Sequence, residues 1–313
     1  MISENFEQFL KTLEDCFPVE KIRRNFPLRK LTTYGVGGPA VFFLKVNSFT
    51  ELEILLPVLR KYSVPLLVIG NGSNLLISDE GFKGFVIQLS GSFEEVAIEN
   101  TTVRAGGAAK LPVVARKTAN SGLSGFEWAV GVPGTVGGAV RMNAGGHGSD
   151  LAASLTEVKV ADLSAEGADL FKLVPASDLG LSYRHSLIKD TDIILEATLH
   201  LDIGEKEKSE DLLHEIVRWR RENQPGGQNS GSVFTNPEGD SAGRLIEIAG
   251  LKGFTVGSAS VSKKHANFIQ VEEGGKAQDV REVMKKVIER VEEVHSVTLV
   301  PETVFVGFER DSL

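Results

Sequence analysis

The pentapeptide Gly70-Asn71-Gly72-Ser73-Asn74 lies between an apolar run at residues 65–69 and a second one at residues 75–77. The first run has the length and composition of a short buried strand, and the glycines mark a turn at its end. A strand is expected at residues 41–46 and a helix after it, so the region forms a strand–helix–strand unit. Open α/β sheets bind ligands at the carboxyl ends of their strands. The stretch therefore predicts an α/β ligand-binding domain.

The helix of this unit is predicted from leucines that recur at helical spacing. Thr50 and Glu53 have the spacing of a capping box, which would place the start of the helix at Thr50. Pro57 lies inside the pattern and is expected to kink the helix.

A second glycine cluster, at residues 131–139, ends a block of short strands that contains one helix at about residues 111–120. Neither cluster has the G-x-G-x-x-G pattern or a Gly-Lys-Ser/Thr sequence, which argues against a Rossmann or P-loop domain. Backbone amides freed by glycine, beside the side chains of Ser73, Asn74 and Thr135, can bind a diphosphate without lysine. Ordinary tight turns explain either cluster alone, but two clusters in one domain favour a dinucleotide.

The rest of the chain is divided by a charged segment at residues 204–208, which is interpreted as a linker and a domain boundary. An amphipathic helix followed by a basic extended arm is expected within residues 1–30, and a helix at residues 211–221. A strand is expected at residues 297–308. One long helix is predicted from an apolar stripe formed by Val280, Val283, Met284, Val287, Val291 and Val294.

The composition limits the class of protein. A chain of 313 residues, 42% apolar and 24% charged, suggests two or three globular domains. The net charge of −8 argues against nucleic-acid binding. No apolar run is long enough to cross a membrane, and the acidic start at residues 1–5 does not resemble a signal peptide. Cys16 is the only cysteine, so no internal disulfide or cysteine-rich zinc site is expected. A cytoplasmic protein without a metal or membrane partner is the expectation.

A serine is presented by the segment Ser230-Gly231-Ser232-Val233-Phe234, which Thr235-Asn236-Pro237 follows as a turn. The glycine lets a ligand approach the backbone and the Val-Phe pair anchors the segment in a core. The hydroxyl of Ser232 is therefore a candidate proton donor, although an isolated segment of this kind is more often structural.

Six segments together resemble the UDP-N-acetylenolpyruvoylglucosamine reductases, a family of flavoenzymes of peptidoglycan precursor synthesis. They are the Thr-x-Gly-x-Gly-Gly-Pro-Ala segment at 33–40, the two glycine clusters, Tyr-Arg-His-Ser at 183–186, Gly-Ser-Val-Phe at 231–234 and Leu-Val-Pro-Glu-Thr at 299–303. The resemblance extends from about residue 20 to about residue 309, with the spacing of the second, shorter type of the family. Two positions depart from its pattern, because Thr235 replaces a usually basic residue and Gln270 replaces a common asparagine.

The resemblance implies an α+β fold. Residues 1–203 would form an FAD-binding domain of the p-cresol methylhydroxylase type, in two lobes divided near residue 90. Residues 204–300 would form a smaller substrate-binding domain, and residues 301–313 a terminal strand that returns to the FAD domain.

The implied cofactor is a tightly bound FAD, which NADPH reduces before it leaves. The implied reaction converts UDP-N-acetylglucosamine enolpyruvate to UDP-N-acetylmuramate, with hydride from flavin N5 and a proton from the protein. The partners are thus small molecules, and the chain is expected to be a monomer or a weak oligomer.

The family motifs also imply site residues. The catalytic ones are Ser232 as proton donor, Arg184 against the developing charge of the substrate carboxylate, and Glu302 in orienting that carboxyl group or in the proton network. The cofactor-binding set is Tyr34, Gly37, Gly70, Asn71, Gly72, Ser73, Asn74, Gly131, Gly134, Thr135, Gly137 and Gly138. Polar and basic residues before and after the serine segment are added as substrate contacts, because binding of the UDP diphosphate requires cations. The substrate-binding set is Tyr183, Arg220, Arg221, Gln224, Asn236, Lys264 and His265, of which His265 is equally suited to a structural hydrogen bond.

Two other functions are weighed against this one. Another FAD oxidoreductase of the same fold, acting on a hydroxy acid or a sugar lactone, would keep the glycine clusters without needing the three catalytic residues. A non-catalytic nucleotide-binding scaffold would be expected to have lost Arg184, Ser232 or Glu302, and all three are present.

Overall fold

A computed structural model describes residues 4–62, 64–164 and 171–308. The chain divides into two compact units, each assembled from three chain segments. The first unit comprises Met1–Arg24, Phe42–Gly70 and Gly84–Arg218, and the second comprises Asn25–Val41, Asn71–Lys83 and Trp219–Leu313. This division follows compactness, so the expected functional boundaries at residues 203 and 300 stay predictions. Residues 1–3 and 309–313, for which an N-terminal and a terminal-strand prediction were made, lie outside the described residues.

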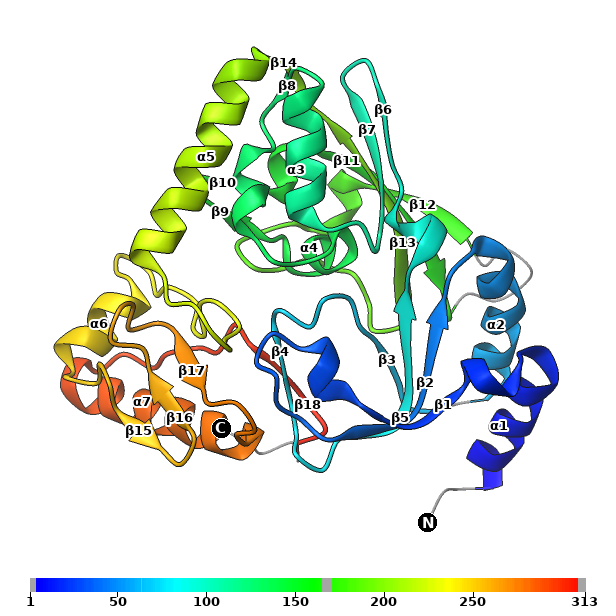
Figure 1. Ribbon diagram of the computed structural model, residues 1–313, viewed down its shortest axis with the longest axis horizontal. Coiled ribbons are helices and arrows are strands. Elements are labelled where there is room, and N and C mark those ends of the chain that lie inside the picture. The colour runs from blue at the N-terminus through cyan, green and yellow to red at the C-terminus, as the bar shows by residue number, and fades with distance from the viewer. Residues whose placement is uncertain (1–3, 63, 165–170, 309–313) are drawn as a thin grey trace. The chain divides into compact units, whose positions relative to one another are not determined.

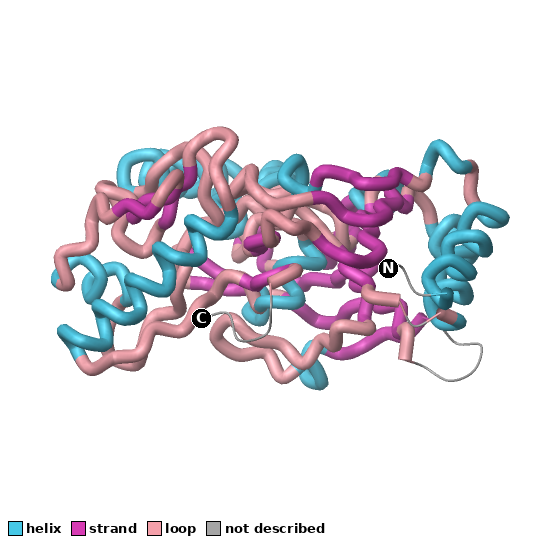
Figure 2. Tube along the Cα trace, turned by 90° about the horizontal axis from the view of Figure 1, so that it is seen from below, coloured by secondary structure: helices cyan, strands magenta, loops and turns pink. Residues whose placement is uncertain are grey.

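The N-terminal part of the chain forms a four-stranded sheet with two helices. The strand order is β1 (Arg23–Pro27), β2 (Pro39–Val46), β5 (Phe82–Leu89) and β3 (Leu66–Val68). The expected strand–helix–strand unit is confirmed, because β2 is followed by a helix at Phe49–Lys61 and then by β3, and both strands lie in this sheet. β3 runs parallel to β5, which separates it from β2. Helix α1 (Glu4–Cys16) packs beside α2 (Phe49–Lys61) (Figure 1, Figure 2). The ring of its buried Phe9 packs edge-on against Phe85 of β5 and Tyr62, the residue after α2.

The capping box of α2 lies two residues earlier than predicted. The Ser48 hydroxyl accepts a hydrogen bond from the Glu51 amide, and the Glu51 carboxylate accepts one from the amide of Asn47 at 2.9 Å. Thr50 and Glu53, which have the same spacing, are therefore not the cap. The helix continues through Pro57.

The larger sheet of the first unit is antiparallel and has five strands. Its order is β12 (Phe171–Pro175), β11 (Leu155–Asp162), β13 (Asp192–His200), β7 (Thr102–Gly106) and β6 (Val96–Glu99). Helices α3 (Leu111–Asn120) and α4 (Val136–Met142) share its hydrophobic core, and α4 contacts β13. Four two-residue strands complete the unit: β8 (Leu123–Ser124), β9 (Gly145–Gly146), β10 (Ser149–Asp150) and β14 (Asp202–Ile203).

The predicted linker at residues 204–208 is wrong in its second half. Helix α5 (Lys206–Asn223) begins inside the charged segment. Lysine and glutamate are good helix formers, and Lys206 and Glu210 form an ion pair one helical turn apart.

The second unit contains a three-stranded sheet with the order β15 (Thr255–Val256), β16 (Ala259–Val261) and β17 (Ile269–Val271). Helix α7 (Ala277–His295) packs on this sheet, and α6 (Ala242–Ile248) packs on α7 (Figure 1). The predicted apolar stripe of α7 is buried from Val280 to Val291, whereas Val294 is 41% exposed. None of the helices among the described residues is long and apolar enough to cross a membrane.

Two short parallel strands join distant parts of the second unit. β18 (Val304–Val306) pairs with β4 (Leu75–Ile77), beside which it lies in Figure 1. The strand predicted at residues 297–308 is thus much shorter than expected. β18 begins two residues after Glu302.

Helix α7 receives its N-terminal cap from Asp79, which is far away in the sequence. The amides of Ala277 and Gln278 donate to the two carboxylate oxygens of Asp79 at 2.9 and 3.0 Å. Lys276, at the N-cap position, makes no side-chain cap bond. A carboxylate there binds amides that would otherwise lack partners and lies at the positive end of the helix dipole.

Replacing Asp79 with alanine should therefore lower the free energy of unfolding by about 1–2 kcal/mol. Urea denaturation followed by circular dichroism measures this change. The neighbouring exposed Glu80, which makes no cap bond, offers a matched control as Glu80→Ala. Equal stability of the two variants would contradict the role of Asp79.

Candidate active site

The serine segment is held on one side by a buried asparagine. Asn267 is 3% exposed, and its carboxamide binds both peptide groups of Phe234: the Phe234 amide donates to Oδ1 at 3.0 Å and Nδ2 donates to the carbonyl at 2.8 Å. The Val233 amide also donates to the Asn267 carbonyl at 2.9 Å. One residue thus replaces a neighbouring strand for the segment that carries Ser232.

The other side of the serine segment is held by residues 300–302. The Glu302 amide donates to the Val233 carbonyl at 2.8 Å, and the Thr235 amide donates to the Val300 carbonyl at 2.9 Å. Phe234 pairs with Pro301 in an antiparallel bridge. The structure therefore brings the segments of Ser232 and Glu302 together, and both residues are half-buried.

His265 supports Asn267. The Asn267 amide donates to Nδ1 of His265 at 3.3 Å, and the imidazole packs edge-on against Phe268. Because Nδ1 accepts a hydrogen bond, the neutral tautomer carries its proton on Nε2. Burial, followed by the charge of Lys252, lowers the pKa of His265 below its ordinary value. The structure thus supplies the structural hydrogen bond, and substrate contact by His265 stays a prediction.

Arg184 lies at the tip of a tight turn in the first unit. Ser182 and His185 exchange two backbone hydrogen bonds of 3.1 Å, which leaves Tyr183 and Arg184 between them. Arg184 has a left-handed φ of +57°, which is strained for a side chain of its size. Its guanidinium lies 5.1 Å from the centroid of the half-exposed Tyr183 ring and donates to the Gly145 carbonyl at 2.9 Å.

This turn is fixed from both ends. Asn143 is 1% exposed and follows α4, where its Nδ2 donates to the Ser182 carbonyl at 2.9 Å. The Ser186 hydroxyl donates to the Arg141 carbonyl at 2.7 Å. The second glycine cluster, through α4, therefore leads directly to the residues that hold Arg184 in place.

Within the first unit, the structure places Gly70 of the first cluster beside Thr135 of the second. A Cβ atom on Gly70 would lie 2.5 Å from Thr135 Oγ1. Thr135 caps α4, since its hydroxyl accepts from the Gly138 amide at 3.3 Å. Gly131 and Gly134 precede this cap, in and after a short 3₁₀ helix.

The amides at the start of α4 are not available as a phosphate nest. The amide of Val136 donates to Ala109, and that of Gly137 donates to Gly107 at 2.8 Å. A Cβ atom on Gly137 would lie 3.0 Å from the Gly107 carbonyl, so close packing explains this glycine. The prediction that these glycines offer free backbone amides is thus wrong for Gly137 and Gly138, whose amides have partners within the protein. Cofactor contact by either residue stays a prediction.

The cofactor residues predicted in the second unit have strong structural constraints. Gly72 has a φ of +53°, and a Cβ atom there would lie 2.1 Å from the Leu31 carbonyl. Gly37 packs against Ile77 in the same way, at 2.9 Å. Asn71 and Ser73 are half-buried in the loop. The Asn74 side chain donates to the Glu302 carbonyl at 3.0 Å.

Tyr34 has no exposed surface, so its ring is not accessible to a ligand in this structure. Its hydroxyl lies beside those of Ser230 and Thr303, but the three are not in good hydrogen-bond geometry with each other or with other described residues. Burial raises the pKa of Tyr34 to about 12, while the two hydroxyls act in the opposite direction. The Tyr34 hydroxyl thus lies next to the segment that carries Ser232 and to the segment that carries Glu302.

The predicted substrate residues of the second unit are only partly gathered. Arg220 Nε donates to Gln224 Oε1 at 2.6 Å, and burial lowers the pKa of Arg220. Lys264 Nζ donates to the Arg221 carbonyl at 2.6 Å. Asn236 lies elsewhere, where its Oδ1 accepts from the Ala242 amide at 3.1 Å.

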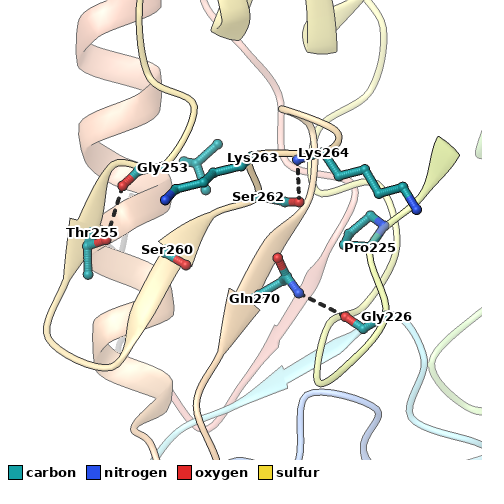
Figure 3. A pocket seen from close by; sticks show the side chains of 10 residues that line it. Pro225, Gly226, Gly253, Thr255, Ser260, Ser262, Lys263, Lys264 and Gln270 are labelled. Atoms are coloured by element: carbon teal, nitrogen blue, oxygen red, sulfur yellow. Dashed lines mark hydrogen bonds between the residues drawn. The ribbon is translucent and has the colours of Figure 1, made fainter. Parts of the chain in front are cut away.

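Lys264 lines an open polar hollow of about 510 Å³. Figure 3 shows Lys263 extending toward Gly253 and Thr255, whereas Lys264 extends the opposite way, past Pro225. Gln270 Nε2 donates to the Gly226 carbonyl at 2.9 Å across the hollow. The two lysines diverge and do not converge on one anion.

Glycines in the first unit leave open space beside the backbone, into which a flat ring could fit. A Cβ atom on Gly146 would meet no atom within 4 Å, and one on Gly138 would meet only Thr135 Oγ1 at 3.6 Å. Glycine leaves room for close approach by a ligand. The residues of this unit therefore fit a flavin nucleotide.

Comparison with known proteins gives matches over both units. Residues 40–168 match the FAD binding domain, and residues 223–306 match the C-terminal domain of UDP-N-acetylenolpyruvoylglucosamine reductase. A protein of Symbiobacterium thermophilum named UDP-N-acetylenolpyruvoylglucosamine reductase 2 is 41% identical over 89% of this chain and 90% of its own. The reductase of Bacillus subtilis is 37% identical over 93% of this chain and 96% of its own.

The chain belongs to the UDP-N-acetylenolpyruvoylglucosamine reductase family. The crystal structure of the Thermus caldophilus reductase agrees, with 37% identity and a TM-score of 0.78 over 91% of this chain and 98% of that chain. The expected family, the FAD-binding fold with a family-specific C-terminal domain, and the flavin cofactor are confirmed.

Two supporting residues of this family member, Asn143 and Asn267, were not predicted as such, whereas a structural hydrogen bond was one of the two roles predicted for His265. Asn143 carries no local signal, whereas Asn267 and His265 stand in the polar run Lys-Lys-His-Ala-Asn, which suggested ligand contacts. A buried asparagine between apolar residues, as in Ala266-Asn267-Phe268, was the available clue, because buried amides require partners.

Lowering the pH should destabilise the protein through His265. Because the pKa of His265 is lower in the folded protein, the unfolded state is protonated first as the pH falls. The stability that neutral His265 contributes is therefore complete above about pH 6.5, the ordinary pKa of histidine, and is lost at lower pH. His265→Asn, which keeps an acceptor for the Asn267 amide, should reduce the slope of unfolding free energy against pH below about pH 6.5. The reduction is a fraction of the roughly 1.4 kcal/mol per pH unit of one proton.

Urea denaturation at several pH values measures that slope. The exposed His214, changed to asparagine, serves as the control. An unchanged slope in His265→Asn would show that this imidazole does not titrate differently on folding.

Proposed function

We propose that this chain reduces UDP-N-acetylglucosamine enolpyruvate to UDP-N-acetylmuramate, with NADPH as the source of electrons. As a family member it is an FAD-dependent oxidoreductase of peptidoglycan precursor synthesis. The observation that carries the proposal is the pairing of the Ser232 and Glu302 segments through the Val233 carbonyl. This backbone bond brings the segment of a serine and the segment of a carboxylate residue side by side, as a proton transfer would require.

Ser232 is the proposed proton donor. FAD that NADPH has reduced would, when bound, supply a hydride to the methylene carbon of the enol ether. Negative charge then develops on the neighbouring carbon, which is a strong enough base to take the serine proton. The Asn267 carboxamide and residues 300–302 keep the backbone around Ser232 fixed, so the hydroxyl needs no reorganisation at that moment.

Arg184 is the proposed partner of the substrate carboxylate. A guanidinium can bind a carboxylate with two hydrogen bonds and stabilise the charge that spreads onto it. The strained turn supports this role, because residues in the left-handed region persist where the surroundings impose them and often serve a function. Tyr183, whose ring lies against the guanidinium, is proposed as a substrate contact.

The remaining expectations are proposed as they stand. Arg220, Arg221, Gln224, Asn236, Lys264 and His265 would contact the UDP-sugar, and Glu302 would orient the carboxyl group or join the proton network. Residues 1–203 would bind FAD, residues 204–300 the substrate, and residues 301–313 would rejoin the FAD domain. The enzyme would act in the cytoplasm as a monomer or weak oligomer, without a metal, nucleic acid or membrane partner.

An anaerobic half-reaction experiment tests the proposal. The protein is reduced with one equivalent of NADPH, mixed with UDP-N-acetylglucosamine enolpyruvate, and followed by flavin absorbance. Ser232→Ala should be reduced normally but reoxidised about 10²–10⁴ times more slowly, the usual contribution of a positioned acid. The exposed Ser177, changed to alanine, is the control.

The outcomes separate the alternatives. A wild-type flavin that stays reduced in the presence of this substrate would contradict the proposal and favour an oxidoreductase for hydroxy acids or sugar lactones. A purified protein without flavin would favour the non-catalytic scaffold. Normal reoxidation of Ser232→Ala would contradict the role of Ser232 as proton donor but not the proposed reaction.

A further inference from the structure

The peptide groups on both sides of Glu302 are fixed by different segments of the second unit. Its amide donates to the Val233 carbonyl at 2.8 Å, and its carbonyl accepts from Asn74 Nδ2 at 3.0 Å. The first bond comes from the serine segment. The second comes from the last residue of the glycine loop, more than 200 positions away in the sequence.

The Asn74 side chain extends the parallel ladder of β4 and β18 at its start, ahead of the first backbone pair. That ladder begins at Leu75 and Val304, and the Val304 amide donates to the Asn74 carbonyl at 2.9 Å. Glu302 lies two residues before this pair, where the parallel strands no longer hold it. The carboxamide reaches back and supplies the missing attachment.

We propose that Asn74 is a positioning residue for Glu302 and that its carboxamide serves the reaction through this carbonyl rather than chiefly by binding FAD. The inference rests on the proposed role of Glu302. Asn74 is only half-buried, yet its donor group points at a peptide carbonyl of the second unit. Without that bond, the peptide group that follows Glu302 loses its attachment to the glycine loop, and the position of Glu302 is less closely defined.

The consequence is a loss of precision at the reacting carbon. Displacing a positioned group by about 1 Å costs up to about a hundredfold in rate. Binding of the flavin and its reduction by NADPH do not use the Glu302 carboxylate in the proposed reaction. A positioning role therefore affects the second half-reaction alone.

The test compares Asn74→Ala and Asn74→Asp with the wild type. The aspartate has the same size but replaces the donor with an oxygen that repels the carbonyl, so it also reports if the alanine variant fails to fold. We expect flavin content, FAD affinity by fluorescence titration and the rate of reduction by NADPH to stay within about twofold of wild type. We expect reoxidation by UDP-N-acetylglucosamine enolpyruvate to slow by about ten- to a hundredfold.

A double-mutant cycle with Glu302→Ala identifies the route of the effect. If Asn74 acts through Glu302, adding Asn74→Ala to Glu302→Ala should slow reoxidation by less than about twofold more. Independent, multiplicative effects would overturn the inference. So would loss of FAD, or equal slowing of both half-reactions, since either would assign Asn74 to the cofactor or to general stability. Failure of the wild type to be reoxidised would instead contradict the proposed function itself.

Discussion

The hydrogen bonds between the Asn267 carboxamide and the two peptide groups of Phe234 are the contact on which the candidate site depends. The serine segment has no neighbouring strand on that side, so one side chain satisfies a donor and an acceptor that are buried together. Each such bond contributes only about 1 kcal/mol net, but leaving buried groups without partners costs about 1–3 kcal/mol each. Because leaving these groups without partners is unfavourable, the backbone next to Ser232 is held in one conformation. His265 secures the arrangement by accepting from the Asn267 amide.

A second asparagine plays the same part in the first unit. Asn143 holds the Ser182 carbonyl and, through Oδ1, accepts from the Ala152 amide at 3.0 Å. The turn that presents Arg184 is thus tied to α4 on one side and to a second loop on the other. Ser232 and Arg184, two of the proposed catalytic residues, lie on irregular backbone. In each case a buried carboxamide makes hydrogen bonds of the kind that a neighbouring strand would otherwise make. Such groups can be aimed with precision without lying inside a regular strand.

The sequence predicts the regular elements well, since helices α1, α3 and α7 follow from apolar spacing alone. Boundaries decided by single hydrogen bonds are less accessible, because Ser48 and Thr50 offer the same capping chemistry and only the folded chain selects between them. Helix α4 was hidden by its glycines, which weaken helix propensity yet are required by close contacts such as that of Gly137 with Gly107. The family motifs indicated the catalytic residues. They carried no information about Asn143 or Asn267, whose partners lie far along the chain.

The composition of the second unit from three separate chain segments has a consequence for how the protein is made. Tyr34, β4 and Asp79 all belong to segments that a ribosome completes long before residues 219–313. Tyr34, β4 and Asp79 cannot complete their contacts until the last ninety-five or so residues arrive, because those contacts are made with the C-terminal core, β18 and α7. The unit therefore closes only after synthesis of nearly the whole chain, by contacts of high sequence separation that form slowly. A fragment beginning at residue 219 would lack a strand, a helix cap and a core tyrosine, so a single cut at that point would not yield an intact second unit.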